Sequence, residues 1–183
     1  EETARMAVDL ANGDPIKDNY CDPINYEVSK PLAADKTVKG LYSGGSLAAE
    51  AGMLIAEALN LGGLIKEEGY ILKTGGYEVV DLGDDVYTQG KPHPMIDPEV
   101  RIKKILECAK DPQTGVILLD CMLGYGCHPD MAGALAPAIR EAQEIAKADG
   151  RELYFVASVC GTRQDPQDYD RAVAELKECG VLV

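Results

Sequence analysis

Strands that are apolar along their whole length constrain the fold of this chain more than any other feature. Two such runs are TGVILLDCML at residues 114–123 and ELYFVASVC at residues 152–160. A strand that faces water on one side alternates apolar and polar residues, whereas a continuous apolar run is typical of a strand covered on both faces. The two runs therefore predict a parallel sheet with helices on both sides.

Helical segments alternate with the strand candidates along the chain. Apolar residues recur at helical spacing in segments 46–60, 97–111, 129–150 and 166–180. The second of these opens with Asp97 and Pro98, a cap followed by a proline, and the third ends at Gly150, a common helix stop. The predicted strands occupy residues 39–43, 78–82, 116–121, 152–160 and 181–183.

This alternation predicts a flavodoxin-like, three-layer α/β/α fold with a five-stranded parallel sheet of order 2-1-3-4-5. In that order the first strand, residues 39–43, lies next to the strands at 78–82 and 116–121. Segment 60–76 reads as turns and polar spacers.

The first 37 residues differ in composition from the rest. EETARMAVDLAN at residues 1–12 has an amphipathic helical pattern, and residues 11–37 are rich in Asp, Asn and Pro. We expect residues 1–37 to be an N-terminal arm or linker, packed along the surface or against a second copy. Residues 38–183 then form one α/β domain, and the missing initiator Met indicates a piece of a longer protein.

Charge and cysteine usage exclude several classes of partner. The formal net charge is −13, which repels phosphate backbones and anionic membranes, so we expect neither nucleic acid nor a membrane as a partner. A small anion is still compatible, because a helix N-terminus binds anions locally. Six cysteines without a C-x-x-C pair, and no signal peptide or membrane-spanning run, predict reduced thiols in the cytoplasm.

The unusual segments all follow strands, where open α/β sheets bind their ligands. They are Ser43–Ser46, DLGDDVYTQGKPHPMIDP at 81–98, GYGCHPD at 124–130 and CGTRQDPQD at 160–168. Both histidines, His93 and His128, lie in these segments, as does Cys160. These three residues are the catalytic candidates, and the edge that carries them is the predicted site.

Each candidate also has a structural interpretation. Ser43–Ser46 is either a turn with a helix cap or a set of free N–H groups that hold an anion. A histidine such as His93 bonds a backbone group or acts in acid–base chemistry, His128 is placed to cap a helix, and Cys160 is either a nucleophile or an ordinary thiol.

Two metal sites are alternatives of the same kind. Asp84–Asp85 is either a solvated pair or a magnesium site. Cys121, Cys127, His128 and Cys160 do not have the spacing of a standard zinc finger, so no metal is assigned.

Four motifs in one order carry a family resemblance: YSGGSLAAEA, DLGDDVYTQGKPHPMIDP, ILLDCMLGYGCHPD and VASVCGTRQDPQ. Over residues 38–183 they resemble the C-terminal half of FdrA proteins, which are acyl-CoA synthetase-like and similar to the α subunit of succinyl-CoA synthetase. The resemblance implies a flavodoxin-like CoA-ligase domain, preceded in the full protein by a CoA-binding domain. It also implies CoA and ATP or another phosphate-bearing ligand, with a β-type partner subunit or a homodimer.

The resemblance assigns roles residue by residue. In succinyl-CoA synthetases the first helix of this domain starts with Ser-Gly-Thr-Leu and holds the phosphate of a phosphohistidine; here the motif reads Gly44-Gly45-Ser46-Leu47. The synthetases carry Gly-His-Ala-Gly after the fourth strand, whereas this chain has CGTRQDPQD without His, so the phosphohistidine is absent. The implied ligand-binding residues are Ser43, Gly44, Gly45, Ser46, Gly124, Gly126, Gly161 and Thr162.

The expected function is acid–CoA ligation or a related acyl or carbamoyl transfer. FdrA relatives are linked to allantoin and oxamate breakdown, which favours a carbamoyltransferase subunit as the alternative. A non-catalytic dimerisation or docking module is the remaining interpretation, and it predicts a large apolar face away from the site.

Overall fold

The computed structural model describes residues 2–17, 33–65 and 67–183. The chain divides into two compact units, Glu1–Pro31 and Leu32–Val183. In the first unit, α1 spans Glu2–Asn12, a helix as its amphipathic pattern indicates. Residues 18–32 of the predicted arm lie outside the described residues. β1 begins at Thr37, so the sheet starts at the last residue of the predicted arm.

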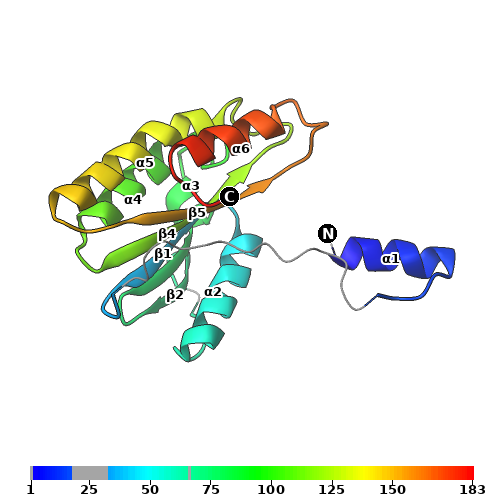
Figure 1. Ribbon diagram of the computed structural model, residues 1–183, viewed down its shortest axis with the longest axis horizontal. Helices are drawn as coiled ribbons and strands as arrows, with labels where there is room; N and C mark the ends of the chain where they lie inside the picture. Colours follow the sequence, from blue (N-terminus) through cyan, green and yellow to red (C-terminus); the bar gives the residue numbers. More distant parts are fainter. Residues whose placement is uncertain (1, 18–32, 66) are drawn as a thin grey trace. The chain divides into compact units, whose positions relative to one another are not determined.

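The second unit is built on one five-stranded sheet, shown in Figure 1. Its spatial order is β2-β3-β1-β4-β5. Leu41 of the central strand lies opposite Val80 on one side and Leu119 on the other, so the predicted neighbours of the first strand are confirmed. The strands are β1 (Thr37–Tyr42), β2 (Tyr70–Thr74), β3 (Tyr77–Asp81), β4 (Thr114–Met122) and β5 (Tyr154–Cys160).

The predicted strand order and the all-parallel sheet are wrong in two respects. β2 arises inside segment 60–76, where the sequence predicts turns, and pairs antiparallel with β3 at the sheet edge. A tight turn through Gly75 (φ 55°) and Gly76 (φ 87°) makes this hairpin, since both residues take the left-handed conformation that two-residue hairpin loops need. The predicted last strand, 181–183, contributes only an isolated bridge between Leu182 and Val156.

Helices cover both faces of the sheet, as the apolar strands predicted. Figure 1 shows α2 below the sheet and α4, α5 and α6 above it. Consecutive residues of β3 alternate accordingly: Val79 packs in the cluster of α2, and Val80 packs in the cluster of α4 and α5. The helices of this unit are α2 (Gly45–Leu59), α3 (Asp85–Thr88), α4 (Glu99–Lys110), α5 (Met131–Ala148) and α6 (Tyr169–Glu178). None of the helices in the described part of the chain combines the length and apolar composition that a membrane span needs.

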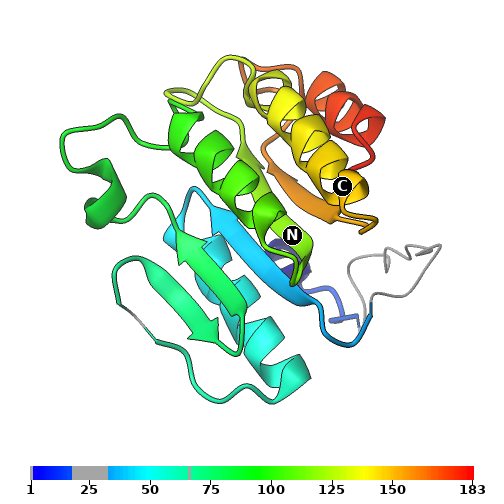
Figure 2. The same ribbon diagram turned by 90° about the vertical axis from the view of Figure 1, so that its left-hand side faces the viewer.

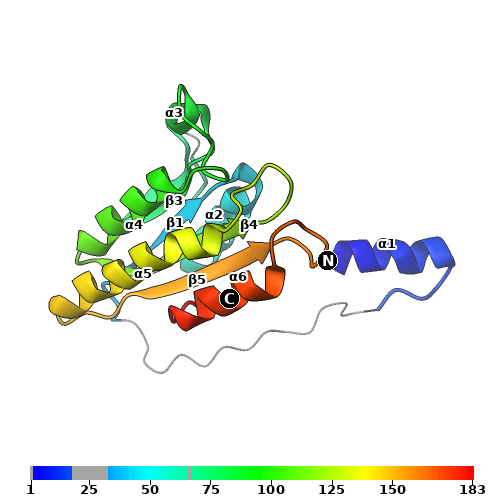
Figure 3. The ribbon, with the colours of Figure 1, turned by 90° about the horizontal axis from the view of Figure 1, so that it is seen from above.

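The carboxyl ends of the parallel strands share one edge of the sheet, which Figures 2 and 3 show from two further directions. β1 ends directly before Ser43, β3 before Leu82, β4 before Leu123 and β5 before Gly161. The segments singled out in the sequence therefore all leave the sheet at this edge.

The hairpin between β2 and β3 gives the first prediction. A Cβ at Gly75 would meet nothing within 4 Å, so a substitution there tests only the left-handed backbone. We expect Gly75→Val to lower the free energy of unfolding by about 1–2 kcal/mol in urea denaturation. Gly75→Asn should lower it much less, because Asn tolerates this conformation. Equal losses for both variants would contradict the turn.

Candidate functional site

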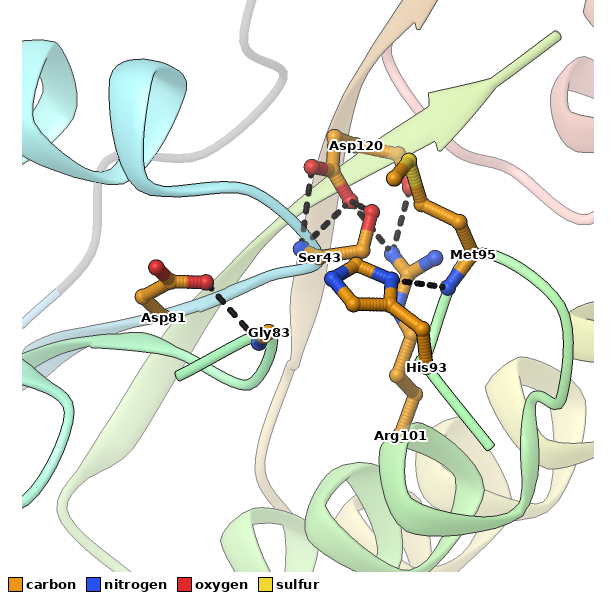
Figure 4. Close-up of polar contacts among 7 residues, drawn as sticks. All are labelled: Ser43, Asp81, Gly83, His93, Met95, Arg101 and Asp120. Carbon is orange, nitrogen blue, oxygen red and sulfur yellow. Dashed lines mark hydrogen bonds and ion pairs between the residues drawn. The ribbon is translucent and has the colours of Figure 1, made fainter. Parts of the chain in front are cut away.

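A buried serine fixes the point where the chain leaves β1. The backbone N–H of Ser43 donates to both carboxylate oxygens of Asp120, at 3.0 and 2.9 Å, and its hydroxyl donates to Oδ1 at 2.9 Å. Asp120 lies in β4, one residue beyond the last pair of the β1–β4 ladder, Leu41 with Leu119. The carboxylate therefore holds β1 and β4 together where their backbone pairing stops (Figure 4).

An arginine from α4 completes this contact. Nη2 of Arg101 lies 3.0 Å from Oδ1 of Asp120 and also donates to the Asp120 carbonyl oxygen. Arg101, Asp120 and Ser43 are all fully buried. Burial lowers the pKa of Arg101, and the Asp120 charge opposes that shift. Among the described residues, Nε and Nη1 of Arg101 have no hydrogen-bond partner.

The start of α2 has free backbone donors. Its N-cap residue, Gly44, is extended (φ −154°, ψ 138°), no side chain of the described residues caps it, and its first turn holds no acidic residue. α5 and α6 start differently, because Asp130 and Asp168 each accept a hydrogen bond from the backbone of the first turn at 3.0 Å. The predicted helix start at Gly45 and Ser46 is thus the one of these three with unoccupied donors.

A cavity of about 530 Å³ opens beside this helix start. Asp81, at the end of β3, places its carboxyl group there: Oδ1 accepts from the Gly83 N–H at 2.8 Å, and Oδ2 would lie 2.9 Å from a Cβ at Gly45. The cavity therefore holds hydrogen-bond donors and carboxylates next to each other. Its lining consists of Gly45, Ser46, Ala49, Leu64, Ile65, Gly69, Ile71, Asp81 and Asp84.

The carboxyl group of Asp81 is held partly away from water. Burial is the largest cause that raises its pKa, and the charges of Asp84 and Asp120 add to it. The Gly83 N–H and His93 act in the opposite direction. Asp81 thus carries its charge less readily than a solvated aspartate does.

Both histidines use Nδ1 as a hydrogen-bond acceptor. Nδ1 of His93 accepts from the Met95 N–H at 3.2 Å, and Nδ1 of His128 accepts from the Asp130 N–H at 3.0 Å. The loops of the two histidines also meet, because the backbone N–H of His128 donates to the Met95 carbonyl at 2.7 Å. An accepting Nδ1 places the proton of the neutral ring on Nε2. Each Nε2 is therefore a donor in the neutral ring rather than a nucleophile.

His93 lies close to the strand ends. Its Nε2 would be only 2.6 Å from a Cβ at Gly83, and the same Cβ would be 3.0 Å from Oδ1 of Asp81. Only glycine fits between these two side chains, which Figure 4 shows together with Ser43.

The other two predicted loops are joined by a glutamine. Gln167 accepts from the Gly124 N–H at 2.8 Å and donates to the carbonyls of Gly124 at 3.0 Å and His128 at 3.2 Å. Gly124 (φ 134°) and Gly126 (φ 85°) take backbone conformations that favour glycine, so this loop has a defined path.

Gly161 and Thr162 lie in a second hollow of about 570 Å³, with Arg163, Gln164 and Tyr169. Among the described residues, the linings of this hollow and of the cavity beside α2 share no member. The structure thus places Gly45 and Ser46 in one cavity and Gly161 and Thr162 in another. Cys160 is exposed at the end of β5, and its carbonyl accepts from the Leu123 N–H at 2.9 Å.

The residues of the two possible metal sites have structural roles instead. Across the described residues, no group of three or more His, Cys, Asp and Glu side chains is arranged to hold a metal ion. Asp84 of the possible magnesium pair caps α3, since its Oδ1 accepts from the Val86 N–H at 3.1 Å. Burial raises the pKa of the Cys121 thiol to about 11, which keeps that thiol protonated at neutral pH.

Four residues at this edge were not predicted from the sequence, although the first two leave a signal: Arg101, Asp120, Asp81 and Gln167. Asp120 interrupts the apolar run ILLDCML, and a charge in a strand covered on both faces needs a partner. Arg101 shares one helical face with Ile105 and Ala109, at i+4 and i+8, so it is the charged residue on a buried stripe. No comparable signal distinguishes Gln167 or Asp81.

Comparisons with known proteins identify the family to which this chain belongs. The CoA-ligase family matches residues 41–183. A protein of Escherichia coli (strain K12), named Uncharacterized protein YahF, is 35% identical over 173 residues, which cover 86% of this chain and 34% of that relative. The chain thus spans about a third of the length of this relative. Since the family match covers most of the chain, including β1 from Leu41 and every later strand and helix, the chain belongs to the CoA-ligase family.

Proposed function

We propose that this chain is the CoA-ligase domain of an FdrA-type, acyl-CoA synthetase-like protein. Its strand-end edge binds an anionic acyl or carbamoyl species, and the full-length protein transfers that group by acid–CoA ligation or by a related carbamoyl transfer. CoA and ATP, an N-terminal CoA-binding domain and a β-type partner subunit or homodimer belong to the same proposal. Its support is the family match over residues 41–183 together with the four FdrA-like motifs.

The observation that carries the proposal is the start of α2. Gly45 and Ser46 line a cavity of about 530 Å³ at a helix N-terminus that no described side chain caps. A helix start has unpaired N–H donors and about half a positive charge, which favours a carboxylate or phosphate group. No side chain at position 45 covers these donors, and the Asp81 carboxylate is the neighbouring group that a bound anion would have to displace.

A second candidate function is a docking module without its own chemistry. The observation that favours it is apolar exposure on and after α2, where Met53, Leu54, Leu59, Leu64 and Ile65 are all exposed. Leu64 and Ile65 also line the α2 cavity, so a docked partner and a bound ligand would be neighbours.

Removing the Ser46 hydroxyl tests the anion site. Ser46→Ala should weaken binding of inorganic phosphate and acetyl phosphate about tenfold, since a hydrogen bond to a charged group contributes about 1.5 kcal/mol. Isothermal titration calorimetry with the 183-residue chain measures this. It is a cleaner probe than Gly45→Val, because a Cβ at Gly45 would displace the Asp81 carboxylate.

Ser158→Ala is the matched control, since Ser158 is exposed on β5 and lines neither described cavity. It should leave phosphate affinity unchanged. Equal binding by parent and Ser46→Ala, with saturable binding in both, would remove Ser46 from the proposed site.

Asp81 gives a prediction for charge and pH. Asp81→Asn should strengthen phosphate binding at pH 7, because it removes a carboxylate that faces the same cavity while the Asn oxygen can still accept from Gly83.

Asp81 should also make the stability of the parent protein depend on pH. A raised carboxyl pKa means that the folded protein binds this proton more tightly, so Asp81 lowers parent stability as pH rises from about 3.8 through the raised value.

The Asn variant lacks that loss. Urea unfolding should show Asp81→Asn gaining stability relative to the parent as the pH rises from about 3 to about 7. This range includes the ordinary carboxyl pKa. A constant difference across that range would contradict the assigned environment of Asp81.

The histidine geometry predicts chemistry without a phosphohistidine. After incubation with ATP or acetyl phosphate, neither His93 nor His128 should carry phosphate in intact-protein mass spectrometry under neutral conditions. Nitrogen-15 NMR of the rings should show the Nε2–H tautomer in both, as their accepting Nδ1 atoms require. Stoichiometric phosphate on either ring, lost after its replacement by Asn, would restore the synthetase-like relay.

A further inference from the structure

The direction of the connections between strands reverses between β1 and β4. From β1 the chain passes through α2 to β2 and β3 on one side, and from β3 it passes through α4 to β4 on the other side. Open α/β sheets bind ligands at such a switch point, outside the carboxyl ends of the strands. In this chain the contact between Ser43, Asp120 and Arg101 lies at that point.

Arg101 is an unusual residue to bury there. Its side chain is fully buried, yet Nε and Nη1 have no partner among the described residues, and only Nη2 contacts Asp120. Buried ion pairs often stabilise a fold no better than apolar residues of the same volume. Stability alone therefore does not account for an arginine on the stripe that continues through Ile105 and Ala109.

The contacts of Asp120 connect Arg101 to Ser43 and so to the start of α2. One carboxylate accepts the Ser43 N–H, the Ser43 hydroxyl and Nη2 of Arg101. Nη2 also donates to the Asp120 backbone carbonyl, so Arg101 contacts both the backbone of β4 and the Asp120 carboxylate. Ser43 is separated from the first residue of α2 only by Gly44. The position of the α2 donors thus depends on Asp120.

We propose that Arg101 is a positioning residue, which acts through Asp120 and Ser43 to hold the start of α2 in its ligand-binding geometry. The ligand in this proposal rests on the proposed function, whereas the role of Arg101 in holding the start of α2 does not. Without the guanidinium, the Asp120 carboxylate loses its cationic partner in a buried site and no longer has one fixed orientation. Ser43 and the first turn of α2 then move relative to β4, while the rest of the sheet keeps its packing.

Arg101→Met tests this, because it keeps an unbranched apolar stem in the buried stripe and removes the charge and the donors. Native-state amide exchange followed by NMR should show Ser43 and Ala48 exchanging about tenfold faster relative to Phe155 of β5. Ala48 reports on α2, since its N–H makes the first helical bond, to Gly44 at 3.2 Å. Phosphate affinity should fall about tenfold. Arg101→Lys should recover part of both effects, because an ammonium group can still donate to Asp120.

Arg151→Met is the matched control. Arg151 is also largely buried, with a side chain 10% exposed, and its Nη2 donates to the Ala109 carbonyl at 2.8 Å, at the other end of α4. It should change exchange at Ser43 and Ala48 no more than at Phe155, and it should leave phosphate affinity unchanged. If Arg101→Met does not fold, Asp120→Asn gives the same test, because it removes the charge that pairs with Arg101 and replaces one of the two oxygens that accept the Ser43 N–H with an NH2 group that cannot accept.

The outcomes separate the two proposals. A uniform increase in exchange at Ser43, Ala48 and Phe155 would overturn the positioning role, since Arg101 would then act on global stability alone. Unchanged phosphate affinity in a variant with a loosened Ser43 would overturn the link to the ligand. If the parent itself binds no phosphate, the proposed function fails, and the exchange ratio alone decides whether Arg101 positions α2.

Discussion

The ion pair between Arg101 and Asp120 is the contact on which the geometry of the proposed ligand-binding edge depends. Two charged groups are fully buried at the carboxyl ends of β1 and β4, where each is costly unless it is paired and hydrogen-bonded. Asp120 meets that condition through Arg101 and Ser43, whereas Arg101 meets it only in part. The backbone ladder between β1 and β4 ends at Leu119, so this pair takes over the connection at the point where the chain turns into α2.

The neighbouring cavity combines two kinds of group that would oppose each other in a pure anion site. The start of α2 presents donors, and Asp81 and Asp84 present carboxyl groups to the same space of about 530 Å³. A bound anion must therefore tolerate Asp81, whose raised pKa makes a proton there easier to hold. In the proposed site, a ligand would therefore bring a hydrogen-bond donor of its own or bind with Asp81 protonated. A bare sulfate-like ion would be accepted less readily.

The alternation of strands and helices, with apolar runs in two of the strands, was enough to predict which parallel strands lie beside the first one. Leu41, Val80 and Leu119 stand in the expected neighbouring strands because a strand covered on both faces has few alternatives in an α/β fold. β2 escaped prediction because Tyr70–Thr74 is short, half exposed and joined to β3 through two glycines, a pattern that reads as a turn. The antiparallel edge follows from that hairpin.

The candidate site was predictable only in part. Gly45 and Ser46 were identified because a glycine-rich strand-to-helix turn has a local signature, and they do line a cavity. The rest of its lining was not, since Leu64, Ile65 and Ile71 come from a segment without a motif. Gly161 and Thr162 were expected in the same site as Gly45 and Ser46, whereas the described cavities place the two pairs in separate linings. Strand ends share an edge, but side chains and loop paths decide which of them meet.

The most direct measurement for the central claim is a crystal structure of this chain grown with acetyl phosphate or inorganic phosphate. The account predicts electron density for the anion within hydrogen-bond distance of the Gly45 and Ser46 N–H groups, with Asp81 turned from it or protonated. Density confined to the hollow of Gly161, Thr162 and Arg163, with the start of α2 unchanged, would contradict the assignment of the ligand to α2.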